Sequence, residues 1–101
     1  NFGPTHRKNM KVIDVAKFAK KFLMSRSKII IKSHNFHESK YLALDSKKSK
    51  KRLNWQTHLT NQNAIKMTLE WFQNYYNSKE RKNLLKFSFK QIKEITKLHN
   101  F

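Results

Sequence analysis

Apolar residues recur at helical spacing in three segments of this chain. The first, Met10–Met24, places its apolar residues on one broad face and most of its lysines on the other, with Asn9 as a candidate N-cap. The second begins after Thr60, a candidate cap, and runs to about Asn77; the third follows Ser88, another candidate cap. The pattern predicts three amphipathic helices whose apolar faces form the core.

Between the first two helices the pattern changes to short β-type runs. Lys28–Lys32 contains three consecutive isoleucines and Tyr41–Leu44 is a short apolar run, so each predicts a strand. A short helix, Ser46–Leu53, then follows a cap at Asp45 or Ser46. Two strands do not form an independent sheet, and we expect them to pair with a region outside this chain. The prediction is a mainly helical α+β fold with about four helices and two short strands.

Composition narrows the class of protein. The chain has 101 residues, enough for one small domain, and its eight Phe, three Tyr and two Trp predict a folded core. It has no Cys, which excludes disulfides and thiolate metal sites and suits a reducing, cytoplasmic location. The single Gly excludes a glycine-rich phosphate loop, and no serine lies in a nucleophile-elbow context. No apolar run approaches the roughly 20 residues of a membrane span.

Taken alone, the net charge of +17 indicates a polyanion partner, such as nucleic acid or an anionic membrane surface. However, arginine, which phosphate and base readers favour, occurs only four times, and the lysines are spread over every segment. The densest basic group, Lys47–Arg52, is therefore interpreted first as a solvated helix face. A small basic nucleic-acid-binding module remains the alternative, and its binding would weaken steeply with salt.

Two clusters carry candidate chemistry. His34, His37 and Glu38 lie close together in sequence and could ligate a metal, line a surface loop, or accept hydrogen bonds from ligand hydroxyls. No fourth metal ligand stands out, so we favour ligand contact over metal. The second cluster contains four aromatic residues that either stack on bases or, as their helical spacing favours, pack in the core. These are Trp71, Phe72, Tyr75 and Tyr76.

Short motifs follow one another along almost the whole chain. They are, in order, Asn1-Phe2-Gly3-Pro4, His37-Glu38, Tyr41-Leu42-Ala43-Leu44-Asp45, Lys48, Leu53-Asn54-Trp55, Ala64-Ile65, Thr68-Leu69-Glu70-Trp71-Phe72 and Gln91-Ile92. Together they resemble the C-terminal part of the CDP-glucose 4,6-dehydratases, a family of the extended short-chain dehydrogenase/reductase group. The family pattern runs NFGP, a helix, H-E-A-x-x-L-x-L-D-x-S-K-A, L-G-W-x-P, A-I-x-x-T-x-x-W-Y and Q-I. The combination of NFGP with His-Glu ahead of Leu-x-Leu-Asp is its most particular part.

The chain departs from the family pattern at four positions. Ser39 replaces Ala, Thr57 replaces Pro and Phe72 replaces Tyr. Asn54 stands where the family has Gly, and Asn tolerates the left-handed backbone conformation better than most residues do. None of these substitutions touches the chemistry of the family directly.

The resemblance implies an enzyme that binds NAD on an N-terminal Rossmann domain and CDP-glucose on a C-terminal lobe. It would oxidise C4 of the sugar, eliminate water across C5–C6 and return the hydride to C6. The dinucleotide-binding loop and the Tyr-x-x-x-Lys pair lie upstream in the family, so residues 1–101 would be the nucleotide-sugar-binding lobe without catalytic residues of their own. Since the chain opens on Asn1 rather than Met, we expect the natural protein to extend further.

Within this lobe the resemblance implies that Glu38, and secondly His37, lies near the nucleotide ribose. It also implies a homodimer when the enzyme is full length, with neither nucleic acid nor membrane as partner. A third hypothesis is a truncated lobe that serves only as a dimer partner.

Overall fold

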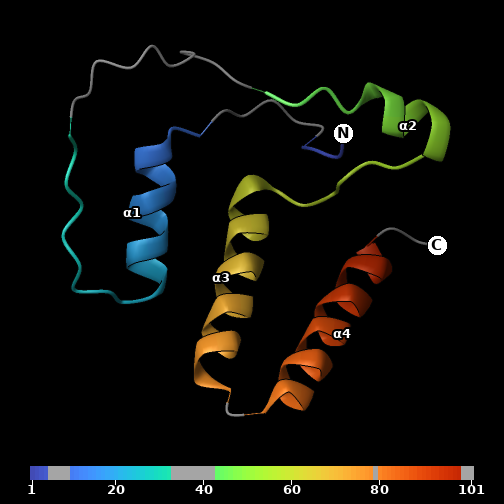
Figure 1. Ribbon diagram of the computed structural model, residues 1–101. Coiled ribbons are helices and arrows are strands. Elements are labelled where there is room, and N and C mark those ends of the chain that lie inside the picture. Colours follow the sequence, from blue (N-terminus) through green and yellow to red (C-terminus); the bar gives the residue numbers. More distant parts are fainter. Residues whose placement is uncertain (5–9, 33–42, 79, 99–101) are drawn as a thin grey trace. The chain divides into compact units, whose positions relative to one another are not determined.

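The structure is a computed structural model that describes residues 1–4, 10–32, 43–78 and 80–98 (Figure 1). The chain divides into two units, Asn1–Thr57 and His58–Phe101. The described residues form four helices and no strand. The helices are α1 (Val12–Phe22), α2 (Lys47–Leu53), α3 (Asn61–Asn77) and α4 (Arg81–Leu98). The mainly helical fold predicted from the sequence is therefore confirmed.

Helix α1 has the predicted amphipathic pattern but is shorter at both ends. Its lysines are exposed and most of its apolar face is half-buried, with the rings of Phe18 and Phe22 stacked at 6.4 Å. The helix ends in a left-handed turn at Met24, whose φ is 48°. The backbone N–H groups of Met24 and Ser25 donate to the carbonyls of Lys21 and Lys20, at 3.2 and 3.0 Å. This Schellman arrangement satisfies carbonyls that the helix end would otherwise leave free. The predicted cap Asn9 lies outside the described residues.

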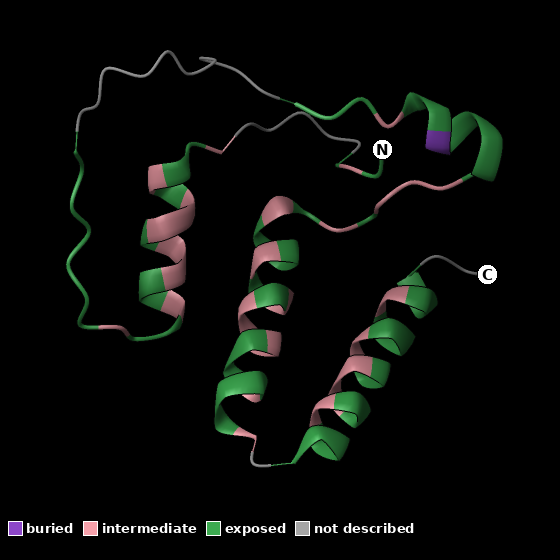
Figure 2. Ribbon diagram, in the orientation of Figure 1, coloured by how far each residue is buried: buried purple, intermediate pink, exposed green. Residues whose placement is uncertain are grey.

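In the second unit, α3 and α4 run side by side in opposite directions (Figure 1). Thr60 caps α3 as predicted, since its hydroxyl accepts a hydrogen bond from the Asn63 N–H at 3.2 Å. The half-buried positions, pink in Figure 2, follow one side of α4, whereas on α3 they spread over more of the circumference. On α4 these are Leu84, Phe87, Ser88, Gln91 and Ile95.

Two long-range hydrogen bonds fix the register of this hairpin. The Trp71 indole N–H donates to the Ser88 hydroxyl at 2.9 Å, and that hydroxyl donates to the Leu84 carbonyl at 2.9 Å. One turn further along, the Gln91 side-chain amide donates to the Met67 carbonyl at 2.8 Å. Because these groups are partly shielded from water, leaving one unpaired would cost more than the bond contributes.

The prediction that Ser88 caps the last helix is wrong. Helix α4 begins at Arg81 and is continuous through Ser88. A serine inside a helix can bond back to the carbonyl four residues earlier, which is the bond Ser88 makes. The apolar stripe that packs on α3 already begins at Leu84, so packing extends the helix beyond the residue that looked like a cap.

The two predicted strands are not shown. Lys28–Lys32 has no strand pairing, and Ile30 and Ile31 are 74% and 80% exposed. Of the second predicted strand only Ala43 and Leu44 are described, again without pairing. A strand forms its backbone hydrogen bonds only with a neighbour, and the described part of the chain provides none.

A fully buried apolar core is also absent from the described residues, where Ser49, at 5% exposure, is the one buried side chain. The aromatic cluster predicted to be core is only partly covered. Trp71 is half-buried, whereas Phe72, Tyr75 and Tyr76 are 46%, 52% and 77% exposed. That expectation is wrong for these three residues, because only one side of α3 faces α4.

We predict that Ser88→Ala lowers the free energy of unfolding by about 1 kcal/mol, because it leaves the half-buried Trp71 N–H without its partner. Thr96→Ala is the matched control. The Thr96 hydroxyl also bonds to the carbonyl four residues earlier, at 2.9 Å, but it is exposed. This control should leave stability unchanged or raise it by about 0.5 kcal/mol, through helix propensity. Urea denaturation followed by circular dichroism measures both, and equal effects would contradict the interhelical role.

Candidate functional site

Two segments that are distant in sequence meet in the first unit. The rings of Phe2 and Trp55 pack edge to face, with centroids 5.0 Å apart and planes at 85°. Beside them Gly3 lies against Leu44 so closely that a Cβ on Gly3 would stand 3.2 Å from the Leu44 Cβ. The segment 1–4 therefore packs on the segment that surrounds α2. Edge-to-face pairs are worth about 0.5–1.5 kcal/mol beyond the area that they bury.

Helix α2 starts one residue later than predicted, and of the two predicted caps Asp45 makes the hydrogen bond. The Asp45 carboxylate accepts a hydrogen bond from the Lys47 N–H at 2.9 Å. Ser46 occupies the N-cap position, but its side chain makes no capping bond. Its carbonyl instead accepts from the hydroxyl of the buried Ser49, at 2.8 Å, and from the Lys50 N–H, at 3.1 Å. A carboxylate at the start of α2 also complements the helix dipole.

The end of α2 directs Trp55 toward Phe2. Asn54 adopts the left-handed conformation, with φ 49° and ψ 26°, and the Trp55 N–H donates to the Ser49 carbonyl at 3.4 Å. This reversal brings the chain back along the helix, where the Trp55 ring meets Phe2. Asn54 is the position at which the resemblance expects Gly. Its backbone shows why a residue that tolerates positive φ is needed there.

The basic residues of α2 face solvent. Lys47, Lys48, Lys50, Lys51 and Arg52 are all exposed. Lys47 lies 4.0 Å from Asp45, a separation at which two exposed charges contribute little to stability. This arrangement is that of the solvated face predicted from the sequence.

The residues predicted to contact the substrate, His37 and Glu38, lie outside the described residues, as does His34. No group of His, Cys, Asp or Glu suited to a metal ion occurs in the part of the chain that the structure describes. Two other segments with motifs of the resemblance do meet in the structure. They are residues 1–4 and the segment from Leu44 to Trp55.

The second unit contains a groove that the sequence did not predict. It has a volume of about 590 Å³ and runs along the contact between α3 and α4. Its walls combine apolar residues, among them Met67, with two ion pairs. Lys66 lies 3.8 Å from Glu70 and Lys90 lies 4.0 Å from Glu94. The groove forms only because α3 and α4 pair, and the spacing of apolar residues along the sequence does not specify which helices pair.

The aromatic residues of α3 contact one another. Trp71 and Tyr75 are parallel at 5.6 Å, and Tyr75 meets Tyr76 edge to face at 5.2 Å. The one basic residue of α3 is Lys66, which is paired with Glu70. A platform for nucleic-acid bases combines aromatic rings with a positively charged groove, and α3 itself offers little positive charge.

Comparison of the chain with protein-family models, with curated proteins and with solved structures found no match. A search of the described helices for one long and apolar enough to cross a membrane also found none.

We predict that Asn54→Gly raises the free energy of unfolding by about 0.5 kcal/mol, because Gly adopts the left-handed conformation without the Cβ strain. Asn54→Ala should lower it by about 1 kcal/mol. The control is Asn83→Gly, at an exposed position of α4 with ordinary helical geometry, where Gly should be destabilising. Urea denaturation measures all three, and stabilisation at both positions, or at neither, would contradict a specific left-handed requirement at Asn54.

Proposed function

We propose that this chain is the nucleotide-sugar-binding lobe of an NAD-dependent CDP-glucose 4,6-dehydratase. The observation that supports the proposal is the contact of residues 1–4 with the segment from Leu44 to Trp55. These segments carry the NFGP, Leu-x-Leu-Asp and Leu-x-Trp elements of the resemblance. Motifs that belong to one binding site are expected to meet in space although they are far apart in sequence.

The proposed role of this lobe is to bind and orient CDP-glucose. Glu38 accepts hydrogen bonds from the nucleotide ribose, and His37 lies beside it. The contacts of Phe2 with Trp55 and of Gly3 with Leu44 would support the segment that leads to them. A bound NAD would supply the hydride-transfer chemistry needed at C4 and C6 of the sugar. This chain offers no dinucleotide-binding loop, because its one glycine, Gly3, packs against Leu44. The cofactor and the proton-transfer residues would therefore belong to an upstream Rossmann domain.

The exposed isoleucines of Lys28–Lys32 also have a role in this proposal. All three consecutive isoleucines, Ile29 to Ile31, are exposed to water. This is unusual for β-branched residues, which more often pack in a sheet. Lys28–Lys32 and Tyr41–Leu44 would become strands once the rest of the enzyme supplies a neighbouring strand. The full-length enzyme would act as a cytoplasmic homodimer, while this chain alone would neither bind NAD nor convert CDP-glucose.

The first test is the coding sequence immediately upstream of Asn1. We predict that it encodes a G-x-x-G-x-x-G loop in the first βαβ unit and a Tyr-x-x-x-Lys pair, because the reaction needs a bound dinucleotide and a proton-transfer tyrosine. Sequencing of the locus and its transcript measures this directly. An in-frame upstream region that lacks both motifs, or turnover of CDP-glucose by residues 1–101 alone, would refute the proposal.

The second test addresses Glu38 in the full-length polypeptide. We predict that Glu38→Gln raises the KM for CDP-glucose about 10- to 100-fold, because hydrogen bonds to a charged group are worth about 1.5–3 kcal/mol. The matched control is Asp14→Asn, an exposed carboxylate in the first turn of α1 that belongs to none of the motifs of the resemblance. Steady-state kinetics should show little change in KM for this control. An unchanged KM in Glu38→Gln would remove Glu38 from the site.

A further inference from the structure

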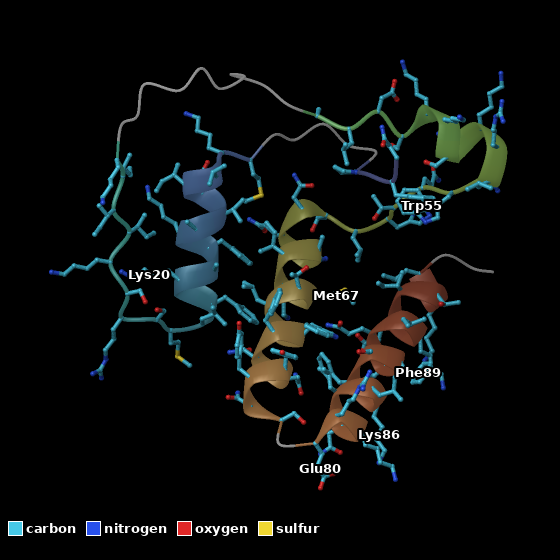
Figure 3. All side chains as sticks on the ribbon, in the orientation of Figure 1. Lys20, Trp55, Met67, Glu80, Lys86 and Phe89 are labelled. Atoms are coloured by element: carbon cyan, nitrogen blue, oxygen red, sulfur yellow. The ribbon has the colours of Figure 1, made fainter. Side chains whose placement is uncertain are left out.

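Helix α4 carries a second apolar stripe on the side that does not pack on α3. Leu85, Phe89 and Ile92 are 56%, 61% and 58% exposed. Their spacing of four and three residues places them on one face of the helix. Figure 3 shows Phe89 projecting from α4 on the side away from α3, whereas Met67 of α3 lies between the two helices. Three large apolar side chains in a row, all more than half exposed, mark an interaction surface more often than isolated ones do.

A row of lysines runs beside this stripe. Lys82, Lys86 and Lys93 are exposed, and their spacing of four and seven residues places them next to Phe89 on the helix surface. Figure 3 shows Lys86 on the same side of α4 as Phe89. Over its whole length α4 contains six basic residues and one acidic residue, Glu94, which is paired with Lys90. We call this side of α4, with Leu85, Phe89, Ile92, Lys82, Lys86 and Lys93, its outer face. It combines an apolar stripe with a row of positive charges.

The opposite side of α4 is held by α3, and this limits what can cover the outer face. Ser88 and Gln91 bond to Trp71 and Met67, so α4 presents one fixed, convex ridge. A protein partner would have to present an apolar groove that matches this ridge and carries acidic residues opposite the lysines. A deformable surface needs no such matched shape.

The charge pattern of the outer face distinguishes between three possible binding partners: a second copy of the chain, a nucleic acid and an anionic bilayer. A second copy would place one lysine row against another, with a net charge of +17 on each chain. Nucleic acid would attract the lysines, but its charged backbone offers no apolar phase for Leu85 and Ile92. An anionic bilayer offers both, since headgroups bind the lysines and the acyl boundary takes up the apolar side chains.

We propose that the outer face of α4 docks on a bilayer surface that contains anionic lipids. Leu85, Phe89 and Ile92 enter the boundary between headgroups and acyl chains, and Lys82, Lys86 and Lys93 lie at the level of the anionic headgroups. The 18 residues of α4 lie along the surface and do not cross it. The resemblance implied no membrane partner, but the net charge alone is compatible with an anionic membrane surface, and surface binding needs only a face of this kind. The proposal rests on α4 alone and is independent of the proposed enzymatic function.

The test is co-sedimentation of the 101-residue chain with vesicles of phosphatidylcholine alone or mixed equally with phosphatidylglycerol. We expect binding to the mixed vesicles only. Binding should weaken as the ionic strength rises from about 0.1 M to about 1 M, which shortens the Debye length from about 10 Å to about 3 Å. No binding to mixed vesicles, or equal binding to both, would overturn the proposal. Full competition by poly-glutamate at low lipid would also overturn it, by indicating an acidic protein as the partner.

Matched variants distinguish the α4 face from general positive charge. Replacing the three lysines, Lys82, Lys86 and Lys93, by Gln should weaken binding on the order of 100-fold, at about fivefold per lysine near the surface. The control replaces Lys47, Lys50 and Lys51 of α2 by Gln; these lysines are also exposed and carry the same charge, and this variant should retain most of the affinity. Equal losses in both triple variants would refute a specific site.

The apolar stripe is tested separately. Phe89→Gln should weaken binding to mixed vesicles about tenfold or more, because the ring no longer leaves water. Tyr76→Gln, which removes an aromatic ring that is 77% exposed on α3, should have little effect. Circular dichroism confirms that each variant keeps its helices, and both residues are exposed, so folding should survive. Unchanged binding of a folded Phe89→Gln variant would overturn the proposal.

Discussion

The hydrogen bond from Trp71 to Ser88 joins the two helices of the second unit. It sets which residues of α4 face α3, and together with the bond from Gln91 to Met67 it sets the register of the hairpin. Both features that the sequence did not reveal follow from it. The groove lies along the line of contact, and the stripe of Leu85, Phe89 and Ile92 lies on the side that this contact turns outward.

Local chemistry in the sequence predicted the helices well where packing and capping agreed. Thr60 caps α3 because its hydroxyl accepts a hydrogen bond from a backbone N–H of the first turn. The carboxylate of Asp45 accepts the corresponding bond at the start of α2. The same reasoning failed at Ser88, where the hydroxyl had a second possible partner, the carbonyl four residues earlier. A serine inside a continuous helix and a serine at its start look alike in sequence. Only the position of Trp71 distinguishes them here.

Strands and core could not be predicted in the same way, because both depend on a neighbour. The isoleucines of Lys28–Lys32 satisfy every local criterion for a strand, but local preference does not supply hydrogen-bond partners. Likewise, the aromatic spacing on α3 identified an apolar helix, but two of its sides are apolar and only one packs on α4. Tyr75 and Tyr76 therefore remain largely exposed. For the candidate site, the sequence indicated Glu38 and His37, while the structure describes the residues on either side of them.

The left-handed turns show how a chain with one glycine still reverses direction. Met24 and Asn54 both have positive φ, near 48° and 49°, and each ends a helix. At Met24 the Schellman bonds offset the strain, whereas at Asn54 the compensation includes the packing of Trp55 on Phe2. The strain at Asn54 is therefore coupled to the contact between residues 1–4 and the segment around α2. Through this coupling, the scarcity of glycine in the chain is linked to the packing of residues 1–4 on the segment around α2.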